Sequence, residues 1–236
     1  MRRLPLVLLL GLVLALVACG GDDKEEAAAP PEATSDATPA PAEAGGCEKV
    51  SEPAPRKAEK LAKPKLELDA AKTYVARVLT SCGEFEITLD AKRAPRTGGA
   101  FLTLVRKGFY DGLIFHRIVP GFVIQGGDPE GQGSGGPGFS VVESPPEDVT
   151  YTKGVVAMAK TQVEAAGTSG SQFFVVTGPK TDLPPDYAVL GKVVSGMDAV
   201  KAIESKSSAQ DGPPSEPVVM ERVTVTAGGS GSGSAQ

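Results

Sequence analysis

Near its middle the chain reads Phe115-His116-Arg117-Ile118-Val119-Pro120-Gly121-Phe122-Val123-Ile124-Gln125-Gly126-Gly127-Asp128. Two short β-strands are predicted here, one that begins just before this stretch, over residues 113–119, and one inside it, over 122–125, because both runs are rich in β-branched and aromatic residues. Alternation along the first strand predicts that Arg117 shares one face with Phe115 and Val119. The stretch is therefore expected to present an arginine next to apolar side chains.

Similar short runs surround this stretch. Phe85, Ile87 and Leu89 alternate with polar residues, which is typical of a half-buried strand. Further strands are predicted over residues 74–80, 155–159, 173–177, 189–194 and 218–225. One helix is expected from Pro95 until Gly108 stops it, and another over 197–204. Many short strands and few helices favour an antiparallel barrel or sandwich.

Composition narrows the possible functions. All eight Phe and four Tyr residues lie between Tyr74 and Tyr187, so the core is expected there. The single histidine, His116, excludes every metal site that needs two histidines. A formal charge of −5 argues against a nucleic-acid partner.

The amino terminus has the features of an export signal. Arg2 and Arg3 precede an apolar run over residues 4–17, which is shorter than the roughly 20 residues of a membrane-spanning helix. Residues 1–18 are therefore predicted to be a signal peptide, with a true anchor helix as the alternative. The run ends in Leu16-Val17-Ala18-Cys19, which resembles the lipobox of bacterial lipoproteins. That resemblance implies lipidation of Cys19, membrane attachment, and a location facing the periplasm or the outer surface.

Composition also predicts the domain boundaries. Residues 20–46 contain no Val, Ile, Leu, Met or aromatic residue and carry a net charge of −6, so they are expected to be disordered. Residues 19–69 are interpreted as the lipidated cysteine and an acidic Ala/Pro-rich tether, and 70–226 as the folded domain. The Gly/Ser-rich residues 227–236 are expected to form a flexible tail.

Two cysteines remain if Cys19 is lipidated. Cys47 lies at the end of the tether and Cys82 in a predicted hairpin turn. Outside the cytoplasm such a pair can form a disulfide, which would attach residues 47–69 to the domain. The alternative is a pair of free thiols.

Three segments together resemble the signature of the cyclophilins. They are residues 115–128, Met158-Ala159, and Gly170-Ser171-Gln172-Phe173-Phe174, and the similarity extends over about Lys72 to Val225. The resemblance implies a mainly β fold: a closed eight-stranded antiparallel barrel with a helix covering each end. It also implies peptidyl-prolyl cis-trans isomerase activity on proline-containing polypeptides, without a cofactor or metal. A monomer is expected.

The family resemblance also assigns the site residues. Arg117 has the position of the catalytic arginine, whose fixed cation stabilises the twisted amide. The substrate-binding positions implied are Phe122, Val123, Gln125, Met158, Ala159, Lys160, Gln172, Phe174, Leu183 and Tyr187. Plain core packing is the alternative for Phe122, Phe174 and above all Met158. His116 is not expected to be catalytic, because the reaction needs no proton transfer.

Several positions depart from the best-known eukaryotic pattern. Val123 replaces a methionine, Lys160 an asparagine and Tyr187 a histidine, and the tryptophan just before Leu183 is absent. None of these changes removes Arg117 or the aromatic positions, so activity on exported proteins during folding is expected. The competing interpretation is a non-catalytic module that binds proline-containing segments, or a holdase, on the membrane surface.

Overall fold

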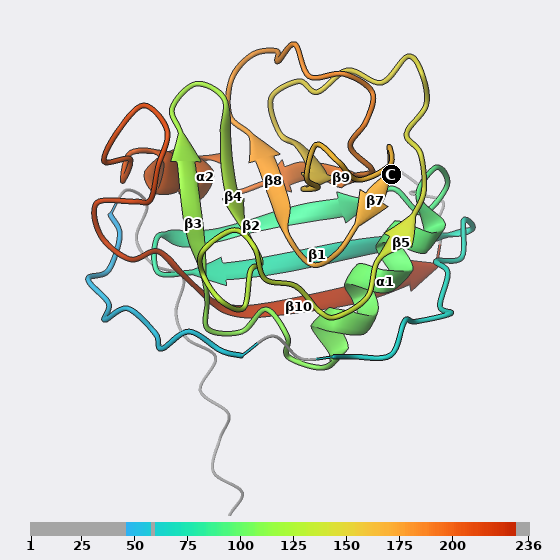
Figure 1. The fold of residues 1–236 in the computed structure, drawn as a ribbon, viewed down its shortest axis with the longest axis horizontal. Coiled ribbons are helices and arrows are strands. Elements are labelled where there is room, and N and C mark those ends of the chain that lie inside the picture. Colours follow the sequence, from blue (N-terminus) through green and yellow to red (C-terminus); the bar gives the residue numbers. More distant parts are fainter. Residues whose placement is uncertain (1–45, 58–59, 230–236) are drawn as a thin grey trace, which may run out of the picture. The chain divides into compact units, whose positions relative to one another are not determined.

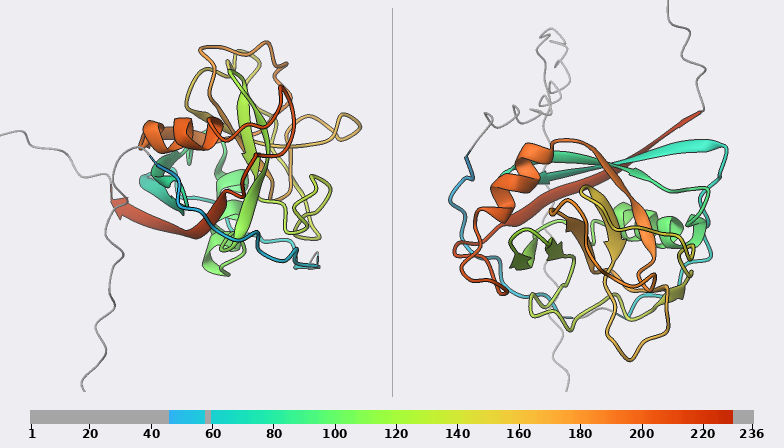
Figure 2. Two further views of the ribbon diagram at one scale, coloured as in Figure 1. Left: turned by 90° about the vertical axis from the view of Figure 1, so that its left-hand side faces the viewer. Right: turned by 90° about the horizontal axis from the view of Figure 1, so that it is seen from above.

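Ten strands and two helices occur in the part of the chain that the computed structural model describes, residues 46–57 and 60–229. The strands are β1 (Lys72–Thr80), β2 (Gly83–Leu89), β3 (Leu113–Val119), β4 (Val123–Gly126), β5 (Val141–Val142), β6 (Val155–Met158), β7 (Thr168–Ser169), β8 (Phe173–Val176), β9 (Val189–Ser195) and β10 (Val219–Gly229). The helices are α1 (Pro95–Arg106) and α2 (Met197–Glu204), which lie on opposite sides of the strands (Figures 1 and 2).

Eight of the strands close into an antiparallel barrel in the order β1-β10-β3-β4-β8-β6-β9-β2. This confirms the predicted fold class and decides for a barrel over a sandwich. Both helices form where they were predicted. The strands β5 and β7, which pair with each other outside the barrel, were not predicted, because two residues are too few for a periodic pattern.

The barrel interior is filled by aromatic rings. Phe101 on α1 packs 5.0 Å from Tyr110 and 6.2 Å from Phe173 between ring centroids, and Phe115 on β3 also lies 6.2 Å from Phe173. All four side chains are fully buried. The Tyr110 hydroxyl donates to the carbonyl of Ser171, so the one polar atom among these rings has a partner.

The predicted face of β3 is partly wrong. Phe115 pairs with Gly126 and Arg117 with Gln125, so the ladder has a bulge at His116. The extra residue reverses the alternation. Phe115 therefore points into the barrel core, while Arg117 and Val119 lie on the other face, where Val119 packs with a second, smaller cluster.

Helix α1 contains two glycines because another segment crosses it closely. A Cβ added to Gly99 would lie 1.9 Å from the carbonyl oxygen of Leu66, and one added to Gly98 would lie 2.4 Å from the side chain of Leu68. The close approach explains why the helix accepts two residues that each cost about 1 kcal/mol relative to Ala.

We call that segment, residues 46–57 and 60–69, the strap. The sequence assigned it to the tether, but it runs along the outside of the barrel from α2 to α1 (Figures 1 and 2). A disulfide joins Cys47 to Cys82, and the backbone N–H of Leu61 donates to the carbonyl of Pro137 at 2.9 Å. Leu68 is buried in the barrel core cluster. The folded part therefore begins about twenty residues before the predicted boundary at residue 70.

The carboxyl-terminal boundary also differs from the prediction. Strand β10 continues through Gly229, and residues 227–229 pair with β1 although the sequence assigned them to a flexible tail. The predicted signal peptide, Cys19, most of the tether and residues 230–236 lie outside the described residues. In the part that is described, no helix is long and apolar enough to cross a membrane.

Candidate active site

A pocket of about 120 Å³ opens on the outer face of β3, β4 and β8. Its floor is apolar, and Arg117 is at its edge. The lining residues are Arg117, Phe122, Val123, Gln125, Ala159, Lys160, Phe174, Leu183 and Tyr187. Nine of the eleven residues that the sequence assigned to catalysis and substrate binding thus meet around one small cavity, although they come from five separate parts of the chain.

Arg117 is fixed from two directions. Its Nε and Nη2 donate to the two carboxylate oxygens of Asp211 at 2.7 and 2.8 Å, and its Nη1 donates to Oε1 of Gln125 at 3.2 Å. Gln125 stands directly opposite on β4. The hydrogen bond from Arg117 lowers the pKa of Asp211, so this carboxyl is ionised at neutral pH. The guanidinium is therefore held in one plane at the pocket's edge.

The two glutamines of the signature form one chain of hydrogen bonds. Gln125 Nε2 donates to Oε1 of Gln172 at 3.0 Å, and Gln172 Nε2 donates to the carbonyl of Gly135 at 2.9 Å. Gln172 does not line the pocket itself. It lies in an adjoining groove of about 630 Å³, which shares Gln125, Ala159 and Lys160 with the pocket. Pocket and groove are therefore continuous along the surface.

The outer wall of this groove is the glycine-rich loop 133–138, and Asp128 organises it. The buried carboxylate of Asp128 accepts backbone N–H bonds from Glu130, Gln132, Gly133 and Gly135. Burial by itself would raise the pKa of Asp128, but these four bonds outweigh it and lower the pKa. The loop is therefore held in place by backbone hydrogen bonds to one buried carboxylate.

Two aromatic rings build the far side of the pocket. Phe174 on β8 and Tyr187 meet edge to face with centroids 5.5 Å apart. Tyr151, which the sequence did not single out, fixes Tyr187: its hydroxyl donates to the carbonyl of Tyr187 at 2.7 Å and accepts the N–H of Tyr187 at 3.0 Å. Burial raises the pKa of Tyr151 to about 12, so this hydroxyl keeps its proton.

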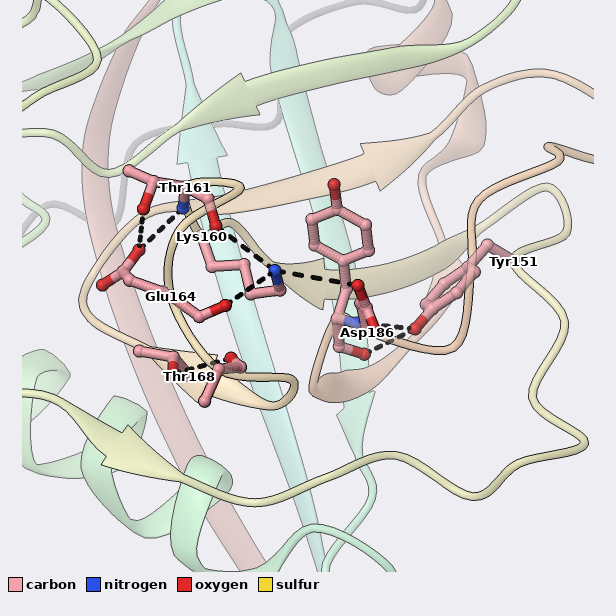
Figure 3. Close-up of polar contacts among 8 residues, drawn as sticks. Tyr151, Lys160, Thr161, Glu164, Thr168 and Asp186 are labelled. Atoms are coloured by element: carbon pink, nitrogen blue, oxygen red, sulfur yellow. Dashed lines mark hydrogen bonds and ion pairs between the residues drawn. The ribbon is translucent and has the colours of Figure 1, made fainter.

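Lys160 lies between pocket and groove with only 4% of its side chain exposed. Its Nζ donates to the carbonyls of Thr161 and Glu164, each at 3.2 Å, and lies 3.9 Å from a carboxylate oxygen of Asp186 (Figure 3). It also sits 5.5 Å from the centroid of the Tyr187 ring. The ammonium group therefore holds the loop that follows β6, and it does not project into the groove as an unpaired charge.

Met158 is the predicted substrate-binding residue that the structure places elsewhere. It is 1% exposed and belongs to the barrel core cluster, whereas its neighbour Ala157 packs in the smaller outer cluster. Alternation along β6 gives the reason: adjacent side chains point to opposite faces. Core packing, the alternative considered for Met158, is what the structure shows.

His116 lies at the bulge of β3 and is buried. Neither ring nitrogen makes a hydrogen bond within the described residues, and the side chain does not line the pocket. Burial lowers its pKa, and the opposing effect of Asp128 is smaller. The imidazole is therefore mainly neutral at pH 7.

Sequence reasoning missed three residues at this site: Tyr151, Asp186 and Asp211. Each is a polar residue in a loop, outside any periodic run or recognised motif, and each acts through a partner distant in sequence. Asp211 is 94 residues from Arg117. Its only signal in the sequence is a turn-forming Asp-Gly-Pro, which says nothing about the side chain's partner.

A closed eight-stranded barrel with a small apolar pocket, an arginine at its edge and a peptide-wide groove beside it defines a class of proteins that bind proline-containing chains. The family described as "Cyclophilin type peptidyl-prolyl cis-trans isomerase/CLD" matches residues 75–225. The chain belongs to this family.

Individual relatives agree. Peptidyl-prolyl cis-trans isomerase B of Bacillus subtilis is 44% identical over 119 residues, covering 50% of this chain and 80% of the relative. A peptidyl-prolyl cis-trans isomerase of Arabidopsis thaliana is 35% identical over 150 residues, covering 62% of this chain and 90% of the relative. The crystal structure of a Cryptosporidium parvum cyclophilin superposes with a TM-score of 0.61 at 28% identity, covering 65% of this chain and 98% of that one. A second structure of that protein, determined in the presence of the dipeptide Ala-Pro, has a TM-score of 0.60.

Proposed function

We propose that this protein, a peptidyl-prolyl cis-trans isomerase by family, accelerates X–Pro isomerisation by stabilising the twisted amide with Arg117 in the apolar pocket. The uncatalysed barrier is about 18–20 kcal/mol, because rotation destroys the resonance between the amide nitrogen and its carbonyl. No bond to hydrogen is made or broken, so the site has only to bind the twisted form better than either planar form.

The observation that carries this proposal is the position of the arginine. Arg117 lies at the edge of a cavity whose other walls include Phe122, Phe174 and Leu183. A prolyl ring held by these walls would bring its amide nitrogen towards the guanidinium. Twisting localises a lone pair on that nitrogen, and a fixed N–H donor can then stabilise it. A 10⁵-fold acceleration requires about 7 kcal/mol of such preference.

The adjoining groove supports a polypeptide substrate. Its backbone-rich wall over residues 133–138 and the amides of Gln125 and Gln172 offer donors and acceptors to the residues that flank the proline. The structure of the Cryptosporidium parvum relative in the presence of Ala-Pro is in keeping with a ligand of this class.

The setting that we propose for this activity is outside the cytoplasm. The predicted signal peptide and the lipobox-like Cys19 support a lipid-anchored enzyme that acts on exported proteins as they fold, in the periplasm or at the outer surface. Slow proline isomerisation leaves such chains exposed to aggregation. Metabolic labelling with a radioactive fatty acid, compared between the natural chain and Cys19→Ala, tests the anchor. Equal labelling of both would refute it.

The activity itself is tested by exchange NMR on a short Ala-Pro peptide, comparing the natural chain with Arg117→Ala. The proposal expects a large acceleration that falls by about a hundredfold or more in the variant. Acceleration unchanged by the substitution would refute the role of Arg117. A peptide that binds without acceleration would identify a binding module in place of an enzyme.

A further inference from the structure

The acid bound to Arg117 is not one of the residues in the family signature. We propose that Asp211 is a positioning residue for the isomerisation, which holds the Arg117 guanidinium so that its remaining N–H groups face the proline pocket. The inference rests on the proposed role of Arg117 and adds a second residue, from a different part of the chain, to that role.

The geometry is that of a forked ion pair. Arg117 donates from Nε and Nη2 to the separate oxygens of one carboxylate, at 2.7 and 2.8 Å. A guanidinium has five N–H bonds. Asp211 takes two of them and Gln125 takes one, which leaves one on Nη1 and one on Nη2 without a described partner. Two partners at an angle to each other determine the plane of the guanidinium, which a single partner could not.

The backbone around Asp211 is anchored to the strand that carries Arg117. The N–H of Ile118 donates to the carbonyl of Gly212 at 2.7 Å, and the N–H of Gly212 donates back to Ile118 at 3.3 Å. Asp211 and Arg117 each directly precede one of these paired residues, so the two side chains are brought together by backbone pairing.

The rest of the loop between α2 and β10 is braced independently. The N–H of Ser215 donates to the carbonyl of Lys206 at 2.6 Å, and Lys206 forms an ion pair with Glu216 at 2.6 Å. Ser207 and Pro214 form a further bridge. The loop is therefore held by contacts that do not involve Asp211, and its side chain is available to act on Arg117.

Two opposing effects of Asp211 can be compared. Its negative charge weakens the field of the guanidinium, but the substrate stays neutral throughout the rotation and the carboxylate is 57% exposed to screening solvent. The direction of the N–H groups, by contrast, decides whether a lone pair on one particular nitrogen receives a hydrogen bond. Orientation is thus the larger effect, and loss of the acid is expected to slow the enzyme.

The test compares the full chain with Asp211→Asn, which keeps the shape and removes the charge. Glu216→Gln is the matched control, because it removes a paired acid from the same loop away from the pocket. We expect Asp211→Asn to lower kcat/KM for an Ala-Pro peptide about 5- to 20-fold, with peptide Kd changed less than twofold, and Glu216→Gln to leave kcat/KM unchanged. The ¹⁵N–¹H resonance of Arg117 Nε should broaden in Asp211→Asn only.

A mutant cycle separates this inference from the proposal beneath it. In an Arg117→Lys background, which keeps the cation but cannot form the fork, Asp211→Asn should change the rate less than twofold. Equal slowing in both backgrounds, or equal slowing by Glu216→Gln, would overturn the role of Asp211. If Asp211→Asn kept the rate of the natural chain and Arg117→Ala were inactive, the role of Asp211 would be overturned and the role of Arg117 would remain. An active Arg117→Ala would overturn both.

Discussion

Phe173 and Phe174 are neighbours on β8, and they belong to two different clusters. Phe173 lies in the barrel core, where it meets Phe101, Tyr110 and Phe115. Phe174 points to the opposite face and belongs to a small cluster with Tyr151, and that cluster opens onto the pocket that Arg117 also lines. One face of the strand thus packs in the barrel core and the other lines the pocket, which under the proposed function divides stability from binding. Substitutions at the two positions should therefore separate these properties.

The largest expected effect is on the core face. Phe173→Ala should lower the free energy of unfolding by about 3–5 kcal/mol, because a fully buried ring is replaced by a cavity. Denaturant unfolding monitored by circular dichroism measures the loss. Should the alanine variant fail to fold, Phe173→Leu, with a smaller loss, serves instead. A folded Phe173→Ala of unchanged stability would contradict the assignment of this face to the core.

The disulfide between Cys47 and Cys82 should also act on stability. Both cysteines pack with the barrel core cluster, away from the pocket. The bond closes a loop with a sequence separation of 35, and its removal is expected to cost about 2–4 kcal/mol. The measurement compares unfolding with and without reductant, using the double variant Cys47→Ser, Cys82→Ser as the control that reductant must not affect. If the double variant lost as much kcat/KM as Arg117→Ala, the disulfide would affect activity as well as stability, which would contradict the comparison.

On the binding face, Phe174→Ala should lower kcat/KM by about tenfold or more, which corresponds to about 1.4 kcal/mol. The pocket loses the ring that Tyr187 packs against edge to face. The free energy of unfolding should fall less in Phe174→Ala than in Phe173→Ala, because part of the Phe174 ring borders the pocket. Exchange NMR and denaturant unfolding on the same samples give both quantities. The reverse ranking of the two phenylalanines in either assay would contradict the comparison.

The smallest effect concerns His116, the extra residue in the bulge of β3. Burial lowers its pKa in the folded state below the ordinary 6.5. As the pH falls through 6.5, the unfolded chain therefore binds a proton that the folded one does not, and stability is lost down to the lowered pKa. Between pH 7.5 and 5.5 the natural chain should lose about 1 kcal/mol or less that His116→Gln does not lose. Equal losses in both would show that the pKa is not lowered, and the rate should not follow this titration.

Local patterns explain why much of this molecule could be predicted. Alternation marked β2, Pro95 and Gly108 bounded α1, and β-branched runs located the remaining barrel strands. These signals depend on neighbours along the chain, so they are present before any folding. The motif around Arg117 contains four of the nine residues that line the pocket, and the rest of the family resemblance supplied the other five.

The features that the sequence did not predict have a common physical origin. The bulge at His116 and the packing of the strap on α1 depend on which segment lies opposite, and no local pattern records that. Alternation along β6 separates Met158 from Ala157, but it does not tell which of the two faces the barrel core. A glycine pair in α1 looks unfavourable until Leu66 is seen to cross it.

By itself the sequence predicted a mainly β fold, the family and, through the family, the closed barrel and the candidate arginine, because strand patterns and long motifs are local properties. Only the tertiary structure decided what holds that arginine. Asp211 reaches it because the pairing of Gly212 with Ile118 brings together residues 94 apart in the chain. The free energy of such a contact exists only once closure of the barrel has brought the two segments within hydrogen-bonding distance.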